Sequence, residues 1–414
     1  MKILTVVDNL GKGGTQRVAQ VFAEAYNTLG HDSRILALYG LGPRYDEVKE
    51  LLTIYHELNE TNLEKIATWR PDVLHIHSHG PELADIETLI AIKQPQCRVI
   101  ETNVFSQPSK WASHVDISYQ LSKWALWIFN LRGGKKYTSA IVPNPVKCDT
   151  FKPAKKNEIR EFRNTHNIPD DAFLLGRIGQ SYPGKWSPLL VEVFDELSKE
   201  IPNLYLLMVN APESILQQAE KSNYRNKIII VPKILGDQKL AIAYSAMNVM
   251  VHIAEQGESF GLVLPEAILC GTPVITMSTP WGDNSQCEVV GHKEGGFVVH
   301  TKKGVKKAIH EIIKRSRSKN LKFHDKIVEE KYAHVRVAEK ALEGIQKIDE
   351  HPDLKMNAIH KILRNSFDRP SLITVFLIRL NVDKLRRLTS YSSGYRDLSM
   401  LIPTLLRLVG VRAK

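Results

Sequence analysis

Residues 258–276 read ESFGLVLPEAILCGTPVIT, and this stretch decides how the rest of the chain is interpreted. Pro265 has no N–H to donate, so we expect a helix that begins around residues 262–264, with the proline in its first turn. Gly271 is a natural C-terminal stop, and the following VIT predicts a strand. The backbone N–H groups of residues 261–264 would then be unpaired and would form an anion-binding site.

Two glutamates, Glu258 and Glu266, bracket this predicted helix start. A carboxylate beside exposed helix amides suits a ligand that has a phosphate at one end and hydroxyls at the other. Glu266 would then bind the hydroxyls, and Glu258 would lie near the reacting centre. The alternative is that a first-turn glutamate only complements the positive end of the helix dipole.

Apolar runs of strand length alternate with helical patterns on both sides of this stretch. ILTVVD (residues 3–8) precedes a glycine loop and a helical pattern that ends at Gly30, and FLLGRIG (173–179) opens a similar series. This alternation predicts an α/β fold with parallel sheets. In the first loop, Gly13 and Gly14 would let the backbone approach a ligand at the carboxyl end of the sheet. The alternative is a tight strand-to-helix turn, and the spacing is not the dinucleotide fingerprint.

The alternation is interrupted at IVPNPV (residues 141–146), where two prolines flank Asn144 and predict an extended connection. We therefore place a domain boundary there. The sequence thus predicts a first domain over residues 1–143, a second over 144–324, one long helix over 325–348, and a basic helical extension over 349–414.

The net charge of +11 is concentrated near the C-terminal end. Residues 352–414 hold twelve Lys/Arg and four Asp, whereas the other residues hold 44 basic and 41 acidic side chains. The extension predicts either peripheral contact with an anionic membrane surface or helices packed on the protein with basic residues facing water. Four scattered cysteines fit a reducing compartment, and neither a signal peptide nor a membrane span is expected.

The 258–276 stretch resembles the signature of the retaining glycosyltransferases of family four (glycosyl transferases group one), whose usual form is EGFGLVLLEAMAAGTPVI. IVPNPV is similar to that family's IPNGVD segment between domains. Arg177 and Lys185 resemble the Arg and Lys of its GR…KG motif, although Trp186 replaces the usual glycine. The resemblance implies a GT-B fold: two Rossmann-like domains that face a cleft, with helix 325–348 crossing back to the first domain.

The resemblance also implies roles for these residues. Arg177 and Lys185 would bind the donor phosphates, since negative charge grows on a diphosphate leaving group. The backbone amides of residues 260–262 would bind the terminal phosphate, and Glu266 would bind the ribose. Glu258 would lie near the transferred sugar and stabilise positive charge on it. The donor-binding residues predicted in this way are Arg177, Lys185, Phe260, Gly261, Leu262 and Glu266, with Gly13 and Gly14 from the first domain.

The chain departs from the family in two places. Asn103 stands where relatives often carry a histidine; it is predicted to act in catalysis with Glu258, but an amide cannot serve as a base. His77 and His79 are candidates on the acceptor side, and the alternative for each is a structural histidine. WGDNSQCE replaces a glycine-rich loop, and its Glu288 matches the glutamate that ends that loop.

The function implied is transfer of a hexose from a nucleotide-diphosphate donor, with retained configuration, to a glycan or lipid-linked acceptor in polysaccharide biosynthesis. No metal is expected, because no Asp-x-Asp motif lies in a donor context, and no other cofactor is expected. We expect a cytoplasmic protein at the inner face of a membrane. The alternatives are a GT-B phosphorylase or epimerase, or a GT-B protein without transferase activity that binds a membrane or partner. Nucleic acid is not an expected partner.

Overall fold

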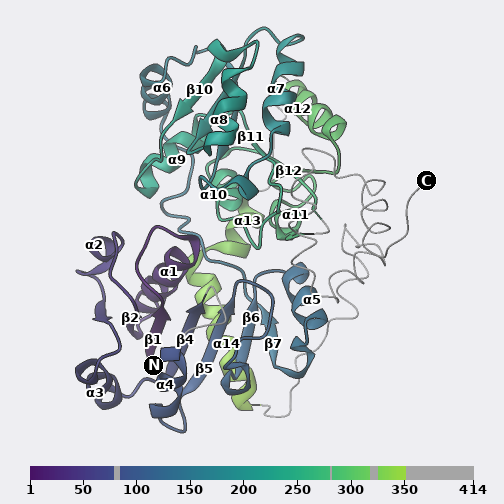
Figure 1. Cartoon of the computed structure of the whole chain (residues 1–414). Coiled ribbons are helices and arrows are strands. Elements are labelled where there is room, and N and C mark those ends of the chain that lie inside the picture. Colours follow the sequence, from purple (N-terminus) through teal and green to yellow (C-terminus); the bar gives the residue numbers. More distant parts are fainter. Residues whose placement is uncertain (79–83, 280–281, 318–324, 351–414) are drawn as a thin grey trace. The chain divides into compact units, whose positions relative to one another are not determined.

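The structure is a computed structural model that describes residues 1–78, 84–279, 282–317 and 325–350 (Figure 1). These residues fall into two compact units. One comprises Met1–Cys148 together with residues 329–350, and the other is Asp149–Val328. The predicted basic extension, residues 349–414, lies almost entirely outside the described residues. None of the helices that the structure describes is both long and apolar enough to cross a membrane.

The first unit is built on a seven-stranded parallel sheet with the order β3-β2-β1-β4-β5-β6-β7. Its strands are β1 (Lys2–Val7), β2 (Asp32–Ala37), β3 (Thr53–His56), β4 (Val73–Ser78), β5 (Arg98–Asn103), β6 (Ile117–Gln120) and β7 (Ser139–Ile141). Its α-helices are α1 (Gly14–Thr28), α2 (Tyr45–Val48), α3 (Glu60–Trp69), α4 (Ala84–Ile92), α5 (Lys123–Leu131) and α14 (His334–Glu350), with short 3₁₀ turns at Ala112–His114 and Gly134–Lys136.

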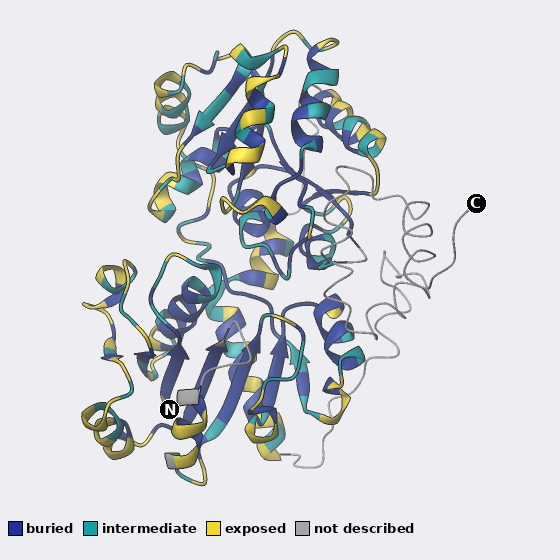
Figure 2. Cartoon of the chain, in the orientation of Figure 1, coloured by how far each residue is buried: buried dark blue, intermediate teal, exposed yellow. Residues whose placement is uncertain are grey.

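Helices cover both faces of this sheet, so its strands are apolar on both sides. In β1, Leu4 and Val6 pack into a core cluster with Ile66 of α3, whereas Val7 packs with Ala19 of α1. Successive side chains of a strand point to opposite faces, which explains the near-continuous apolar run of this strand. Figure 2 shows the resulting buried strands and the exposed outer faces of the helices.

Helix α14, although last in the described sequence, completes the first unit. It packs against α1 and β6, and the Tyr119 hydroxyl of β6 donates a hydrogen bond to the Ala341 carbonyl. A Cβ at Gly344 would lie 2.5 Å from that same hydroxyl, so glycine permits the close approach of helix and sheet. The last helix therefore belongs to the core of the first unit.

The sequence predicts one helix over residues 325–348, and this is wrong: the structure has α13 (Asp325–Tyr332) and α14, separated at Ala333. The backbone of Val146 explains the break. Its N–H donates to the Tyr332 carbonyl at 2.7 Å, and its carbonyl accepts from the His334 N–H at 3.0 Å. These groups pair with the strand-like Val146 segment, so the helical hydrogen-bond pattern is interrupted there.

The second unit has a six-stranded parallel sheet with the order β10-β9-β8-β11-β12-β13. Its strands are β8 (Phe173–Ile178), β9 (Leu204–Val209), β10 (Ile228–Val231), β11 (Val249–His252), β12 (Val274–Met277) and β13 (Gly296–Val299). Its helices are α6 (Lys156–Thr165), α7 (Leu189–Ser198), α8 (Glu213–Glu220), α9 (Asp237–Ser245), α10 (Val263–Leu269), α11 (Ser285–Val290) and α12 (Lys302–Arg317), with 3₁₀ turns η3 (Pro183–Lys185) and η4 (Arg225–Lys227). Helix α13 begins in this unit and ends in the first, since the boundary lies after Val328.

The helix predicted from the 258–276 stretch is confirmed as α10, which has Pro265 in its first turn. Gly271 adopts φ +82°, and its N–H donates to the Ile268 carbonyl, while Thr272 N–H donates to the Ala267 carbonyl. This is the Schellman arrangement that a left-handed glycine permits. Strand β12 follows directly, as the sequence predicts.

Gly344→Ala tests the packing of α14. Glycine-to-alanine in a helix normally stabilises by about 0.5–1 kcal/mol. Here the added methyl meets Tyr119, so we expect destabilisation of about 1–3 kcal/mol, measured by urea unfolding. Gly14→Ala is the matched control, because nothing lies within 4 Å of its Cβ position; it should be neutral or stabilising. A stabilised Gly344→Ala variant would contradict the packing described.

Candidate active site

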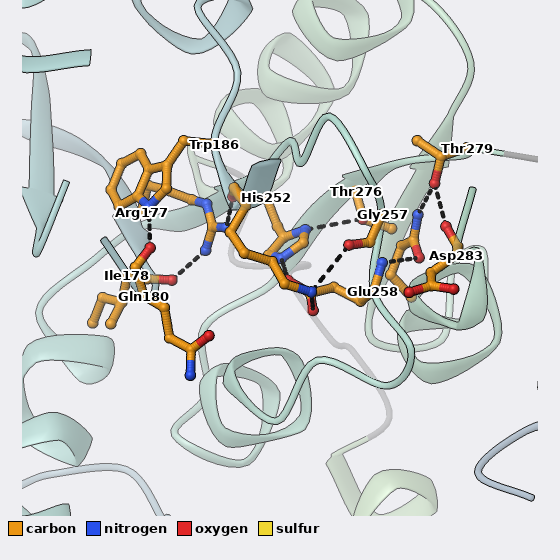
Figure 3. Close-up of polar contacts among 12 residues, drawn as sticks. Arg177, Ile178, Gln180, Trp186, His252, Gly257, Glu258, Thr276, Thr279 and Asp283 are labelled. Carbon is orange, nitrogen blue, oxygen red and sulfur yellow. Dashed lines mark hydrogen bonds and ion pairs between the residues drawn. The ribbon is translucent and has the colours of Figure 1, made fainter. Parts of the chain in front are cut away.

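Polar side chains gather at the carboxyl edge of the second sheet, where β8, β11 and β12 are neighbours. Arg177 is the penultimate residue of β8, His252 ends β11, and Thr276 is the register partner of His252 on β12. The loops that follow these strands bring Lys185 and Glu258 to the same place. Figure 3 shows Glu258 beside His252. Ligands of open α/β sheets bind at this edge.

Glu258 is the centre of the cluster. Its Oε2 lies 2.6 Å from Lys185 Nζ and its Oε1 lies 3.1 Å from His252 Nε2, while the residue is only 8% exposed. Burial alone would raise the pKa of this carboxyl group, but the Lys185 charge and the His252 hydrogen bond outweigh burial and hold the pKa well below its usual range. Glu258 is therefore a stable carboxylate.

Lys185 is the more accessible partner, since 24% of its side chain is exposed. Burial acts to lower the pKa of its ammonium group, but the charge of Glu258 outweighs burial and raises that pKa. Its Nζ also lies 3.3 Å from the Gly257 carbonyl. The ammonium is thus charged and partly open to solvent.

The backbone of Glu258 is fixed from the other side, by the start of α11. Its N–H donates to Gln286 Oε1 at 3.0 Å, and its carbonyl accepts from the Ser285 N–H at 3.1 Å. The preceding Gly257 has φ +69°, and a Cβ there would meet the Asp283 carbonyl oxygen at 1.7 Å. Only glycine therefore fits at position 257. The backbone of Glu258 is held by α11 and its side chain by Lys185 and His252, so the two are held by separate contacts.

Arg177 lies behind this pair, buried against Trp186 (Figure 3). Its guanidinium carbon is 5.0 Å from the Trp186 ring centroid, and its N–H groups donate to the Ile178 and Lys185 carbonyls. Burial lowers the pKa of Arg177 to about 10, which leaves it charged near neutral pH. Trp186, where the family pattern has glycine, covers the arginine.

The residues around α10 have different exposures. Phe260 is buried, whereas Gly261 and Leu262 are half-buried, and no described residue accepts a hydrogen bond from the N–H of either of the latter two. Glu266 is 1% exposed, and its Oε2 accepts a 2.9 Å hydrogen bond from the Tyr244 hydroxyl. The predicted ribose-binding carboxylate is therefore oriented by a tyrosine of α9.

Two glycines predicted to face the donor begin α1 in the first unit. Gly13 is the N-cap residue, and a Cβ there would overlap the Gln16 side chain at 2.0 Å. Gln16 in turn donates to both carboxylate oxygens of Asp8, at 2.9 and 3.1 Å. Gly14 has open space at its Cβ position. The absence of a side chain at Gly13 thus serves the packing of Gln16.

Asn103 ends β5, and its amide is engaged within its own loop. Its Nδ2 donates to the Gln107 carbonyl at 2.8 Å and lies 3.3 Å from Glu101 Oε2. His77 is the penultimate residue of β4, and both of its ring nitrogens are buried without a hydrogen-bond partner among the described residues; burial lowers its pKa to about 3. His79 lies outside the described residues.

Sequence reasoning missed His252 and Gln286, which contact Glu258 directly. The signal for His252 was present: it is a polar residue at the end of an apolar strand, six residues before Glu258. Within WGDNSQCE the sequence singles out Glu288, yet it is Gln286 of this segment that accepts the hydrogen bond from the Glu258 N–H. Glu288 is half-buried on α11, and Trp281 lies outside the described residues.

The cluster joins one carboxylate to two cations and a neutral imidazole. Such a site attracts an anion through Lys185 and Arg177, and it offers a fixed negative charge beside that anion. Among the described residues, no group of three or more His, Cys, Asp or Glu could hold a metal ion.

The comparison with known families identifies this region. The sequence model of the family "Glycosyl transferases group 1" matches residues 158–333. Residues 158–333 belong to the glycosyl transferases group 1. This glycosyltransferase domain contains the whole Arg177–Lys185–His252–Glu258 cluster, and it agrees with the family that the sequence resembles.

Curated relatives match part of the chain. A D-inositol 3-phosphate glycosyltransferase from Segniliparus rotundus is 30% identical over 142 residues, which cover 33% of this chain and 30% of the relative. A lipopolysaccharide 1,2-N-acetylglucosaminetransferase from Salmonella typhimurium is 28% identical over 146 residues, covering 33% and 37%. The match thus spans about a third of the length of these relatives.

Solved structures match a larger part of this chain than the curated relatives do. HepE from Anabaena, in complex with UDP and glucose, has a TM-score of 0.67 at 14% identity, covering 84% of this chain and 99% of that one. A glycosyltransferase from Rickettsia africae has a TM-score of 0.69 at 18% identity, covering 84% and 99%. At these identities the likeness shows the fold, which is the predicted GT-B class with two Rossmann-like domains.

Replacing Glu258 by Gln tests the electrostatics of this glycosyltransferase domain. The variant leaves Lys185 without its counter-charge, so we expect a loss of about 1–3 kcal/mol near pH 7, reduced from the value for a fully buried pair because Lys185 is partly exposed. A carboxylate with a lowered pKa contributes stability above its unfolded pKa of about 4.3 and loses it as the pH falls toward its folded pKa.

The deficit of Glu258→Gln should therefore be constant from neutral pH to about pH 5 and shrink below about pH 4, as measured by urea unfolding across that range. Glu213→Gln, at an exposed glutamate of α8, is the control and should show neither effect. A deficit that does not depend on pH would show that the ion pair is not its source.

Proposed function

We propose that this chain is a retaining glycosyltransferase that moves a hexose from a nucleotide diphosphate to a glycan or lipid-linked acceptor, without a metal ion. One observation carries the proposal: a carboxylate held by Lys185 and His252, with Arg177 behind it, at the carboxyl edge of the second sheet. Residues 144–324 would bind the donor, and residues 1–143 would bind the acceptor.

The diphosphate would bind beside Glu258. Lys185 would contact it as a point charge, since part of its side chain is exposed. Arg177 would act through its charge, because both of its terminal nitrogens already donate to backbone carbonyls, while its Nε is buried without a hydrogen-bond partner among the described residues. The N–H groups of Gly261 and Leu262, with that of Phe260, would bind the terminal phosphate; the half-burial of the first two leaves room for this contact.

We propose a uridine diphosphate sugar as the donor. The support is that HepE from Anabaena, which shares this fold, forms complexes with UDP and with UDP-glucose. Glu266 would accept hydrogen bonds from the ribose hydroxyls, while the Tyr244 hydroxyl keeps its Oε2 oriented.

In the proposed reaction the acceptor hydroxyl would attack the anomeric carbon on the same face of the sugar from which the diphosphate departs. As the glycosidic bond breaks, the ammonium of Lys185 stabilises the leaving group, and the carboxylate of Glu258 stabilises positive charge at the anomeric carbon. The leaving phosphate takes the acceptor proton. Asn103 would act with Glu258 in catalysis, Gly13 and Gly14 would bind the donor, and His77 would bind the acceptor. His79, also proposed to bind the acceptor, lies outside the described residues.

The acceptor side is proposed from the charge of residues 352–414, which carry twelve basic and four acidic side chains. This segment would contact an anionic membrane surface on its cytoplasmic face, where a lipid-linked acceptor resides. The chain would then act in the synthesis of a polysaccharide. The alternatives are a GT-B phosphorylase or epimerase, and a GT-B protein that binds without transferring.

Donor binding and turnover test the proposal together. At about 100 times its dissociation constant, UDP-glucose should stabilise the protein by about 2.7 kcal/mol in EDTA, measured by thermal shift. Lys185→Ala should weaken UDP binding about 10–100-fold because it removes a charge-assisted bond to phosphate. Glu258→Gln should retain UDP binding but lose about 100-fold or more in turnover, followed by NMR, which also reports the anomer of the transferred sugar.

Lys199→Ala, at an exposed lysine just after α7, is the control and should bind UDP like the wild type. Binding without turnover would favour the non-transferring protein. Turnover that requires inorganic phosphate would favour a phosphorylase, and an isomerised nucleotide sugar would favour an epimerase. Loss of activity in EDTA would contradict metal independence, and an inverted product would contradict retention.

The proposed membrane contact is tested by charge substitution in the full chain. Lys384→Gln/Arg386→Gln/Arg387→Gln should weaken binding to vesicles that contain anionic phospholipid, by up to about 1 kcal/mol per charge removed. The change should disappear at high salt and with purely zwitterionic vesicles. Vesicle binding is measured by cosedimentation. Equal binding by the wild type and the variant on anionic vesicles would refute an electrostatic contact through these residues.

A further inference from the structure

The two oxygens of the Glu258 carboxylate have unlike partners. Lys185, on Oε2, is a charged group on a flexible chain with 24% of its side chain exposed. His252, on Oε1, is a rigid ring whose side chain is 1% exposed and is anchored at the end of β11. A ligand can draw the Lys185 side chain away from Glu258, whereas the buried ring of His252 is held in place at the end of its strand.

The hydrogen bonds of His252 define its protonation. An ionised carboxylate only accepts, so Nε2 must carry the proton that faces Glu258. Nδ1 then accepts from the Thr276 hydroxyl, whose oxygen lies 3.4 Å away. Both ring nitrogens of the neutral imidazole thus have a partner.

The surrounding charges favour this neutral form. Burial and the positive charge of Arg177, from β8, lower the pKa of His252 to about 4, with Lys185 acting in the same direction and Glu258 opposing them. The imidazole therefore orients Glu258 without cancelling its negative charge. An imidazolium would neutralise the carboxylate and weaken its effect on a positively charged sugar carbon.

We propose that His252 is a positioning residue, which holds the Glu258 carboxylate in place when a bound diphosphate draws Lys185 from Oε2. The inference rests on the proposed function, since it requires a diphosphate at Lys185. A diphosphate carries more negative charge than one carboxylate, so it competes for the ammonium group. Once Lys185 also binds the diphosphate, the Nε2–H of His252 and the backbone hydrogen bonds to α11 keep the Glu258 carboxylate in its orientation.

Two substitutions separate this role from a purely structural one. His252→Phe keeps a buried ring and removes the N–H donor, and His252→Gln restores an N–H donor on an unbranched side chain. We expect His252→Phe to lower the kcat for UDP-glucose about 10–100-fold, with the dissociation constant of UDP changed less than about threefold. His252→Gln should recover most of the lost kcat.

Thr276→Val is the matched control, because it removes the Nδ1 partner of His252 but leaves the donor to Glu258. It should lower kcat by less than about fivefold. An unchanged kcat in His252→Phe would overturn the inference. A parallel fall in kcat, UDP affinity and melting temperature in both histidine variants, with no recovery in His252→Gln, would show a structural role and would also overturn it.

Nitrogen-15 NMR of the wild-type chain gives a test that does not depend on a variant folding. The His252 ring should be neutral, with its proton on Nε2, both without ligand and with saturating UDP near pH 7. A ring that becomes protonated or moves its proton to Nδ1 on UDP binding would overturn the inference. Failure of the wild type to bind UDP or turn over UDP-glucose is a separate outcome, which overturns the proposed function itself.

Discussion

The buried carboxylate of Glu258 is the constraint on which the rest of the second domain depends. A carboxylate that is 8% exposed is unfavourable unless its charge is compensated and its oxygens are hydrogen-bonded. Lys185 supplies the charge, His252 supplies a neutral donor, and Gln286 fixes the backbone. Three separate chain segments must therefore meet at one point, and each has to be placed by the fold.

The parallel sheet performs this placement. Its neighbouring strands β8, β11 and β12 all end at one edge, so the residues at their ends and the loops that follow lie together although they are up to a hundred residues apart in sequence. Glycines at 257 and 261, both with positive φ, then turn the chain so that Glu258 points back at the strand ends. The helix that follows, α10, begins at Val263.

Much of the fold could be predicted from the sequence because its signals are local. The Pro265 and Gly271 positions define α10, and apolar runs define the strands. The break at Ala333 could not be predicted, since it arises from backbone hydrogen bonds to Val146, which is far away in sequence. For the same reason the sequence identified Lys185 and Glu258 but not their contacts with His252 and Gln286, which exist only once β11 and α11 are assembled. The burial of Arg177 could not be predicted from the sequence either, because burial depends on how the elements pack together.

The central claim is that the ammonium group of Lys185 moves from Glu258 to a bound diphosphate, while the Glu258 carboxylate stays in place. A crystal structure of the full chain with UDP tests this most directly. The account predicts Lys185 Nζ within hydrogen-bond distance of a phosphate oxygen, at about 2.7–2.9 Å, and an unbroken contact between Glu258 and His252. A diphosphate bound away from Lys185, or a Glu258 side chain that has left His252, would contradict it.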